Sequence, residues 1–124
     1  MNRKQQGDIG VGQAVAHYMS LGYVVCFPMT DSARYDLVVD DGNSLLRIQV
    51  KTSKYKKPSG SYEVKLATSG GNQSWSGVVK KISKDECDKV FVYTLDGDKY
   101  EFPAEFLDNK GSVTLDKNKD EYRV

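Results

Sequence analysis

The spacing of apolar positions predicts one helix near the start of the chain. Between residues 5 and 21, apolar side chains recur every three or four positions, and Gly22 follows as a typical residue at a helix end. Gly7, Gly10 and Gly12 weaken the first turns of this helix by roughly 1 kcal/mol each relative to Ala. We therefore expect another group to pack or bind close to this part of the backbone.

The remaining apolar pattern predicts strands. Short apolar or alternating runs, separated by turn residues, lie at residues 23–27, 35–39, 44–52, 62–67, 89–95 and 99–102. The Asp-Asp-Gly-Asn turn at residues 40–43 joins the second and third runs into a hairpin. Pro103 opens a short helical turn through Leu107. This order predicts an α/β fold, with α+β as the alternative, built on a mixed central sheet flanked by helices.

The strand after the hairpin turn has two different faces. Side chains alternate along a strand, so Ile48 and Val50 are expected to face the core. Arg47, Gln49 and Lys51 then share the opposite face.

Length and composition are those of one small domain covering residues 1–124. The chain has 124 residues, 28% of them charged, and a mean hydropathy of −0.56. Its longest apolar stretch, residues 23–29, is far shorter than a membrane span, and we expect no charged-then-apolar leader before it. Cys26 and Cys87 are far apart and show no metal or disulfide spacing. We expect a cytoplasmic protein with reduced thiols and no membrane contact.

The charge is distributed unevenly. Residues 42–84 contain nine Lys or Arg and one acidic residue, a net charge of +8, whereas residues 85–124 carry −5. A basic middle between acidic ends suits a protein that attracts phosphate on one face. Nucleic acid is therefore the expected partner, and an ordinary solvated lysine surface is the alternative.

One group of residues has the chemistry for phosphodiester cleavage. Asp36 lies near the start of a predicted strand, and Gln49 and Lys51 lie on one face of the next strand. Asp36, the Gln49 amide oxygen and the Val50 backbone carbonyl offer oxygen ligands for a divalent ion, and Lys51 adds a cation. The alternative is that Asp36 is a cap or surface group and that Gln49 and Lys51 are ordinary exposed strand residues.

Several short segments resemble the PD-(D/E)XK nuclease superfamily. They are Gly7-Asp8-Ile9-Gly10, Leu21-Gly22-Tyr23, Pro28, Ser32-Ala33-Arg34-Tyr35-Asp36-Leu37-Val38-Val39 and Arg47-Ile48-Gln49-Val50-Lys51-Thr52-Ser53. The match is best over residues 5–53. It is most similar to the branch that contains an intron-encoded homing endonuclease, and more distantly to archaeal Holliday-junction resolvases.

The resemblance implies a restriction-endonuclease-like core and a role for each matching residue. It implies that Asp36 binds metal and that the (D/E)xK element falls on Gln49, Val50 and Lys51, with Gln typical of this branch. The cofactor implied is Mg²⁺, with Mn²⁺ as a substitute. The activity implied is endonucleolytic hydrolysis of duplex or branched DNA, of homing-endonuclease or resolvase type, by a homo-oligomer that presents two sites.

The first helix departs from the family pattern. Where the family tends to place a Glu, this chain has Val11. Asp8, one turn earlier, is a weak substitute, because an acid in a first turn more often favours the helix dipole. The alternative function is therefore a catalytically impaired or inactive DNA-binding module. A third is a protein-interaction domain that binds an acidic partner.

The remaining candidates concern DNA contact and competing sites. Residues expected to contact DNA are Arg34, Arg47, Lys54, Lys56, Lys57, Trp75, Lys80 and Lys81. Glu63-Val64-Lys65 repeats the ExK spacing on a later strand but lacks the Asp36 hairpin partner. His17 is the only histidine and has no implied metal or nucleophile partner.

Overall fold

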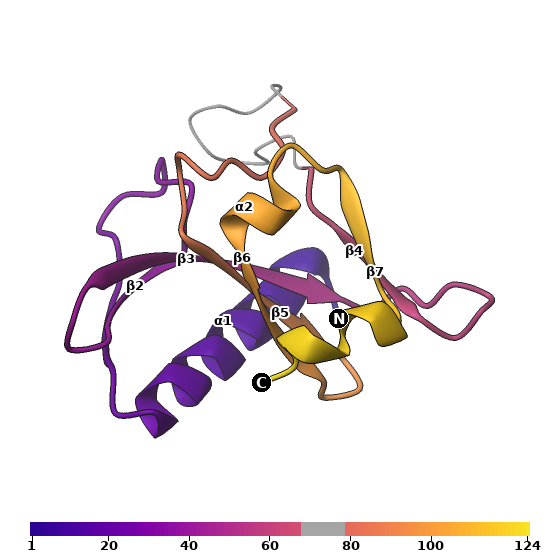
Figure 1. The fold of residues 1–124 in the computed structure, drawn as a ribbon, viewed down its shortest axis with the longest axis horizontal. Coiled ribbons are helices and arrows are strands. Elements are labelled where there is room, and N and C mark those ends of the chain that lie inside the picture. The colour runs from indigo at the N-terminus through magenta and orange to yellow at the C-terminus, as the bar shows by residue number, and fades with distance from the viewer. Residues whose placement is uncertain (68–78) are drawn as a thin grey trace.

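A five-stranded sheet carries the residues of interest, with strand order β1-β2-β3-β5-β6 (Figure 1). The computed structural model describes residues 1–67 and 79–124, so Trp75 lies outside the described residues. The elements are α1 (Arg3–Ser20), β1 (Val24–Cys26), β2 (Leu37–Asp40), β3 (Leu45–Ser53), β4 (Tyr62–Lys65), β5 (Lys89–Thr94), β6 (Lys99–Pro103), α2 (Ala104–Leu107), β7 (Ser112–Leu115) and the 3-10 helix η1 (Lys117–Tyr122). The predicted α/β class with a mixed sheet flanked by helices is confirmed.

Helix α1 covers one face of the sheet. It begins two residues before the predicted start because Asn2 and Gln5 form a reciprocal capping box, which satisfies backbone donors of the first turn. Ala14 and Tyr18 are buried against β2, β3 and β5, and we call this group the α1-side cluster; its buried members are Ala14, Tyr18, Leu37, Val39, Ile48 and Phe91. The Tyr18 hydroxyl donates to Glu101 Oε2 at 2.7 Å and thereby ties α1 to β6.

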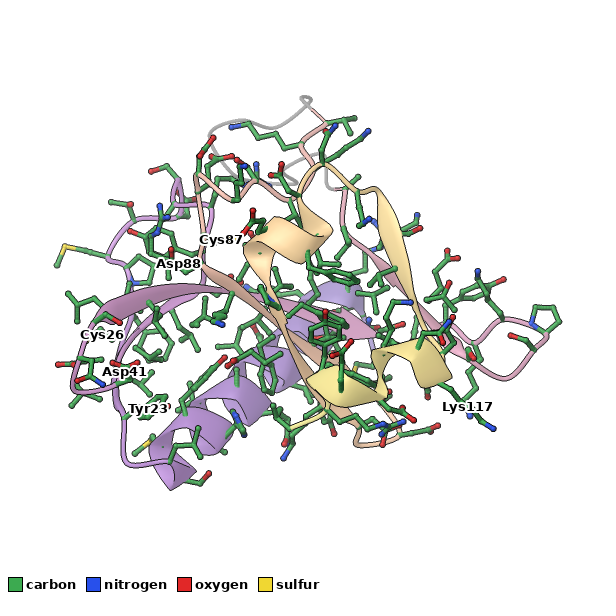
Figure 2. All side chains as sticks on the ribbon, viewed as in Figure 1. Tyr23, Cys26, Asp41, Cys87, Asp88 and Lys117 are labelled. Carbon is green, nitrogen blue, oxygen red and sulfur yellow. The ribbon has the colours of Figure 1, made fainter. Side chains whose placement is uncertain are left out.

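The opposite face of the sheet carries a second group of packed elements. Buried side chains of β5 and β6 pack there against α2 and the two-stranded sheet of β4 and β7, which forms a second apolar cluster. Cys87 is buried in this cluster, whereas Cys26 is exposed on β1, and both thiols are free (Figure 2). Within the described ranges, no helix is both long and apolar enough to cross a membrane.

The pairing of β3 decides which side chains share a face. β3 is antiparallel to β2, with Leu37 opposite Ile48, and parallel to β5, with Ile48 opposite Lys89. Ile48 is buried on the α1 side, so Gln49 and Lys51 face the other way, as the alternation predicts. The parallel β3–β5 pair and strand β7 are features that the sequence pattern does not predict.

One of the three helix glycines is a packing requirement. A Cβ built on Gly10 would overlap the Thr52 hydroxyl of β3, whereas nothing lies within 4 Å of the corresponding positions on Gly7 and Gly12. The expectation that something packs close to this backbone therefore holds at Gly10, where α1 rests directly on β3.

We predict opposite effects of alanine at two of these glycines. Gly10→Ala should lower the free energy of unfolding by on the order of 1–3 kcal/mol, because the methyl group forces α1 away from β3. Gly12→Ala should raise it by up to about 1 kcal/mol, because alanine is the better helix former at an open position. Urea unfolding of both variants measures this difference, and equal effects would refute the close contact.

Candidate active site

Asp36 is fixed to β3 by both its backbone and its side chain. It lies just before β2, and its N–H donates to the Ile48 carbonyl at 2.8 Å. Its carboxylate oxygen Oδ2 accepts the Val50 N–H at 2.7 Å. The paired residues of β2 and β3 end at Leu37 and Ile48. The Asp36 carboxylate therefore accepts the Val50 N–H that a backbone carbonyl would accept if β2 were longer.

The same arrangement directs a backbone carbonyl toward Asp36. In a strand, the N–H and C=O of one residue point to the same side. The Val50 N–H points to Asp36, so the Val50 carbonyl also faces the space beyond the end of β2. Gln49 precedes Val50 on β3 and lies on the strand face that it shares with Lys51. The structure thus joins Asp36 to the backbone of Val50, and the ligand role of Gln49 stays a prediction.

Burial shapes the charges of the site. Desolvation raises the pKa of the Asp36 carboxyl above its usual value, and the Val50 hydrogen bond and the Lys51 charge oppose this shift. Desolvation lowers the pKa of Lys51, and the Asp36 charge opposes it, while Arg34 adds to the lowering. Asp36 and Lys51 therefore stabilise each other's charged form in a partly dehydrated place.

The donor set is compatible with a magnesium ion. In the described parts of the chain, no three His, Cys, Asp or Glu side chains are grouped so that they could hold a metal. Mg²⁺ commonly takes one or two carboxylates and completes its shell with waters and substrate phosphates. The proposed ligands fit this coordination preference, because they are all hard oxygen donors: one carboxylate, one amide oxygen and one backbone carbonyl.

The first helix brings no acid to this place. Val11 is half-buried and packs against the α1-side cluster, and Asp8 is exposed. Gly10, next to Val11, contacts β3 at Val50 and Thr52, so this turn of the helix lies beside the strand that carries the site.

Both predicted arginines are near the site and both are engaged by the protein. Arg34 is only 7% exposed; its Nη2 donates to the Lys81 carbonyl at 3.4 Å. Arg47 binds Asp88 through Nε at 3.2 Å, and the Asp88 carboxylate also accepts the Arg47 N–H. This hydrogen bonding lowers the pKa of Asp88, so the pair remains charged. The acidic partners, Asp88 for Arg47 and Glu86 for Arg34, were not predicted. They lie far from the arginines along the chain, and the sequence does not show that they meet in the fold.

The predicted lysines do not gather at one end of the sheet. Lys56 pairs with Asp96 at 2.9 Å, and Lys57 pairs with Glu63 at 3.3 Å, beside the last residues of β5. Lys80 and Lys81 lie in the segment that leads to the first residues of β5. Six strand residues span about 20 Å, which separates the two groups. Lys54 is exposed at the end of β3.

The competing candidates have other surroundings. Glu63 and Lys65 belong to β4 in the two-stranded sheet, and Glu63 is held by Lys57. His17 packs edge-on against the Tyr18 ring with centroids 5.0 Å apart, and burial lowers its pKa. His17 is therefore a packing residue of α1.

Solved structures show what this arrangement is similar to. A bacterial homing endonuclease, I-Ssp6803I, superposes with a TM-score of 0.82 at 27% sequence identity, over 99% of this chain and 89% of that chain. The Holliday junction resolvase Hjc of Archaeoglobus fulgidus superposes with a TM-score of 0.60 at 12% identity, over 95% of this chain and 89% of that chain, which is a likeness of fold. A comparison with curated proteins gives no match.

The sequence itself matches the PD-(D/E)XK endonuclease family over residues 1–123. The resemblance inferred mainly from residues 5–53 thus extends over nearly the whole chain. Family membership and the likeness to the homing endonuclease support nuclease function. The chain belongs to the PD-(D/E)XK endonuclease family.

Proposed function

We propose that this protein is a Mg²⁺-dependent endonuclease that hydrolyses phosphodiester bonds of duplex or branched DNA. The observation that carries the proposal is the Asp36 carboxylate held on the Val50 N–H, with Lys51 near enough to oppose the rise in the pKa of Asp36. A desolvated acid, two neutral oxygen donors and a cation on one strand edge are the groups that phosphodiester hydrolysis requires.

Each residue has a distinct task in this proposal. Asp36, the Gln49 side-chain oxygen and the Val50 carbonyl would hold the divalent ion, which supplies Lewis-acid chemistry toward the phosphate. Lys51 stabilises the negative charge that builds on the phosphate oxygens as water attacks phosphorus and the leaving P–O bond breaks. Burial lowers the pKa of Lys51, and the Asp36 charge opposes this shift and so favours the protonated form that the task requires.

The partner is DNA, bound through basic residues around the site. Lys80 and Lys81 lie in the segment that receives Arg34, and this segment is close to the Asp36 side of the sheet. Each subunit has one proposed site, so cleavage of both strands of a duplex calls for two copies. A homo-oligomer with two-fold symmetry is the simplest arrangement that provides them.

A second candidate function is a DNA-binding module without activity. One observation favours it: Asp36 is the only charged ligand in the proposed donor set, and apolar Val11 stands where the family tends to place a glutamate. A single carboxylate weakens the attraction for a divalent ion relative to two.

We predict that Asp36→Asn and Lys51→Ala each abolish cleavage of plasmid DNA in Mg²⁺ or Mn²⁺. Both variants should retain DNA affinity within a few-fold, because the residues act on the ion and on the transition state. Lys65→Ala is the matched control, since it removes the lysine of the competing ExK repeat, and it should cut normally. Loss of activity in this control with retention in Lys51→Ala would move the site to β4.

We predict that Val11→Glu strengthens metal binding and cleavage by about tenfold, because a second carboxylate near the ion adds roughly 1–4 kcal/mol of attraction. Val15→Glu is the control: Val15 packs against the same cluster one turn further on. It should only destabilise, as an unpaired acid in an apolar cluster does. Calorimetry with Mn²⁺ and thermal unfolding test both variants. A loss of stability in Val11→Glu without a gain in affinity would contradict the placement of this helix turn beside the ion.

We predict that the lysines near the site contribute more to DNA affinity than those at the far end of β5. Lys81→Ala should reduce the slope of log K against log salt by about 0.9, because one phosphate contact is lost. Lys56→Ala should change it less, because Lys56 is already paired with Asp96. Fluorescence anisotropy at several salt concentrations measures both slopes. A larger change in Lys56→Ala would place the DNA at the other end of β5.

A further inference from the structure

Arg34 is buried, which is unusual for an arginine expected to contact DNA. It lies two residues before Asp36, and its side chain is only 6% exposed. Its Nη2 donates to the Lys81 carbonyl at 3.4 Å, and its Nη1 lies 3.8 Å from Glu86 Oε1. Burying a guanidinium is costly unless the protein supplies partners, so these contacts hold the side chain in place.

The loop that ends in Asp36 is held by Tyr35, which packs against the second apolar cluster, and by Asp36 and Arg34. Residues 27–36 connect β1 to β2 without regular secondary structure. The Asp36 N–H bond to Ile48 fixes the last residue of the loop to β3. Arg34 fixes the loop to a different part of the chain, the segment of residues 81–88, which we call the anchor segment.

The anchor segment is also tied to β3. Arg47 Nη1 donates to the Asp85 carbonyl at 3.0 Å, and its Nε lies 3.2 Å from Asp88 Oδ2. One segment thus receives an arginine from the loop before β2 and another from β3. These two parts of the chain are the ones that supply the proposed metal ligands.

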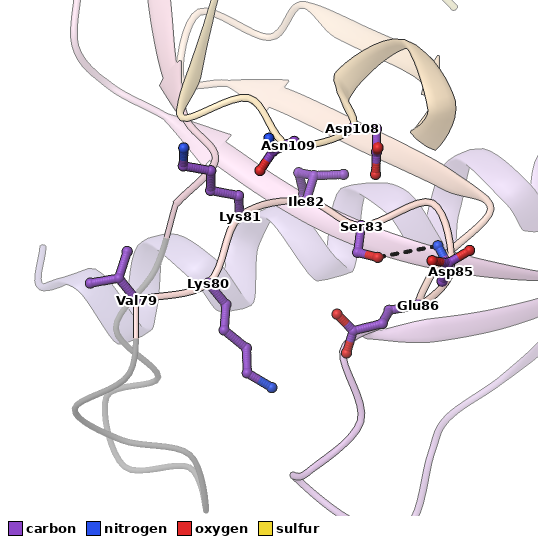
Figure 3. Close-up of a pocket in the computed structure, with 9 residues that line it drawn as sticks. All are labelled: Val79, Lys80, Lys81, Ile82, Ser83, Asp85, Glu86, Asp108 and Asn109. Carbon is purple, nitrogen blue, oxygen red and sulfur yellow. Dashed lines mark hydrogen bonds between the residues drawn. The ribbon is translucent and has the colours of Figure 1, made fainter.

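The anchor segment is exposed to the solvent on its other side. Figure 3 shows the preceding residues and part of this segment around an open cavity of about 630 Å³, with the Lys81 and Glu86 side chains at its wall. Glu86 thus borders this cavity and also reaches Arg34, and the exposed Lys81 offers its backbone carbonyl to Arg34.

We propose that Arg34 is a positioning residue for Asp36: by binding the anchor segment through Glu86 and the Lys81 carbonyl, it sets the place of the Asp36 carboxylate relative to Val50. The inference rests on the proposed function in assigning Asp36 to the reaction. A direct contact of Arg34 with DNA is disfavoured by the geometry, because the side chain is enclosed and its Nη atoms are directed at the anchor segment.

Steady-state cleavage by Arg34→Met and Arg34→Lys tests this role. Arg34→Met should lower kcat by at least about tenfold and leave KM for DNA within about threefold, because small misplacements of a reacting group cost much rate. Arg34→Lys should restore part of kcat, since it keeps the charge. Arg123→Met is the matched control: Arg123 pairs with Asp98 and Asp120 next to β6, away from the site, and its loss should leave kcat unchanged.

A second readout is independent of cleavage. The Val50 N–H reports the position of Asp36 directly, so its hydrogen exchange should become at least about fivefold faster in Arg34→Met, while other amides of β3 keep their rates. If the wild type does not cut DNA, the proposed function fails, and the Val50 amide alone still decides the positioning role. Glu86→Gln, at a position whose side chain is 40% exposed, gives the same test should Arg34→Met not fold.

The outcomes separate the roles. A fall in kcat together with faster exchange at Val50 supports positioning. A raised KM with unchanged kcat and unchanged Val50 exchange overturns it in favour of direct DNA binding. Lower thermal stability with an unperturbed Val50 amide and unchanged kcat overturns it in favour of a structural role only.

Discussion

The hydrogen bond from the Val50 N–H to the Asp36 carboxylate organises the proposed site. It forms because the residue pairing of β2 with β3 ends at Leu37. The Asp36 carboxylate then accepts the Val50 N–H, which a longer β2 would accept through a backbone carbonyl. The same interruption directs the Val50 carbonyl to the side where Asp36 lies. A sheet that continued regularly would use both backbone groups of Val50 in strand pairing. The end of one strand thus leaves the Val50 backbone to pair with a carboxylate instead of with a neighbouring strand.

The charges around this strand end depend on one another. Burial disfavours the ionised forms of Asp36 and Lys51, and each is kept charged partly by the other. Arg34 adds a further buried cation, whose cost Glu86 offsets. Removing one member of this set leaves its partner buried without compensation. The position of the carboxylate is therefore sensitive to residues that do not belong to the donor set.

The sequence predicts what is local and not what depends on distant contacts. The alternation along β3 correctly places Gln49 and Lys51 on one face, and the hairpin turn brings Asp36 to the same strand at Val50, because both follow from neighbouring residues. The parallel pairing of β3 with β5 and the β4–β7 pair join segments far apart, and no local signal specifies them. The burial of Arg34 was missed for the same reason: its partners lie about fifty residues later and belong to a segment that is largely polar in the sequence.

The most direct test of this account is the position of the metal ion itself. Nuclear magnetic resonance of the labelled protein, titrated with a substoichiometric amount of Mn²⁺, identifies the nearest groups by paramagnetic broadening. The account predicts that the backbone amides of Asp36 and Val50 and the side-chain amide of Gln49 broaden first, and that Asp36→Asn abolishes the effect. Broadening that begins at Glu63, or that persists unchanged in Asp36→Asn, would contradict the proposed site.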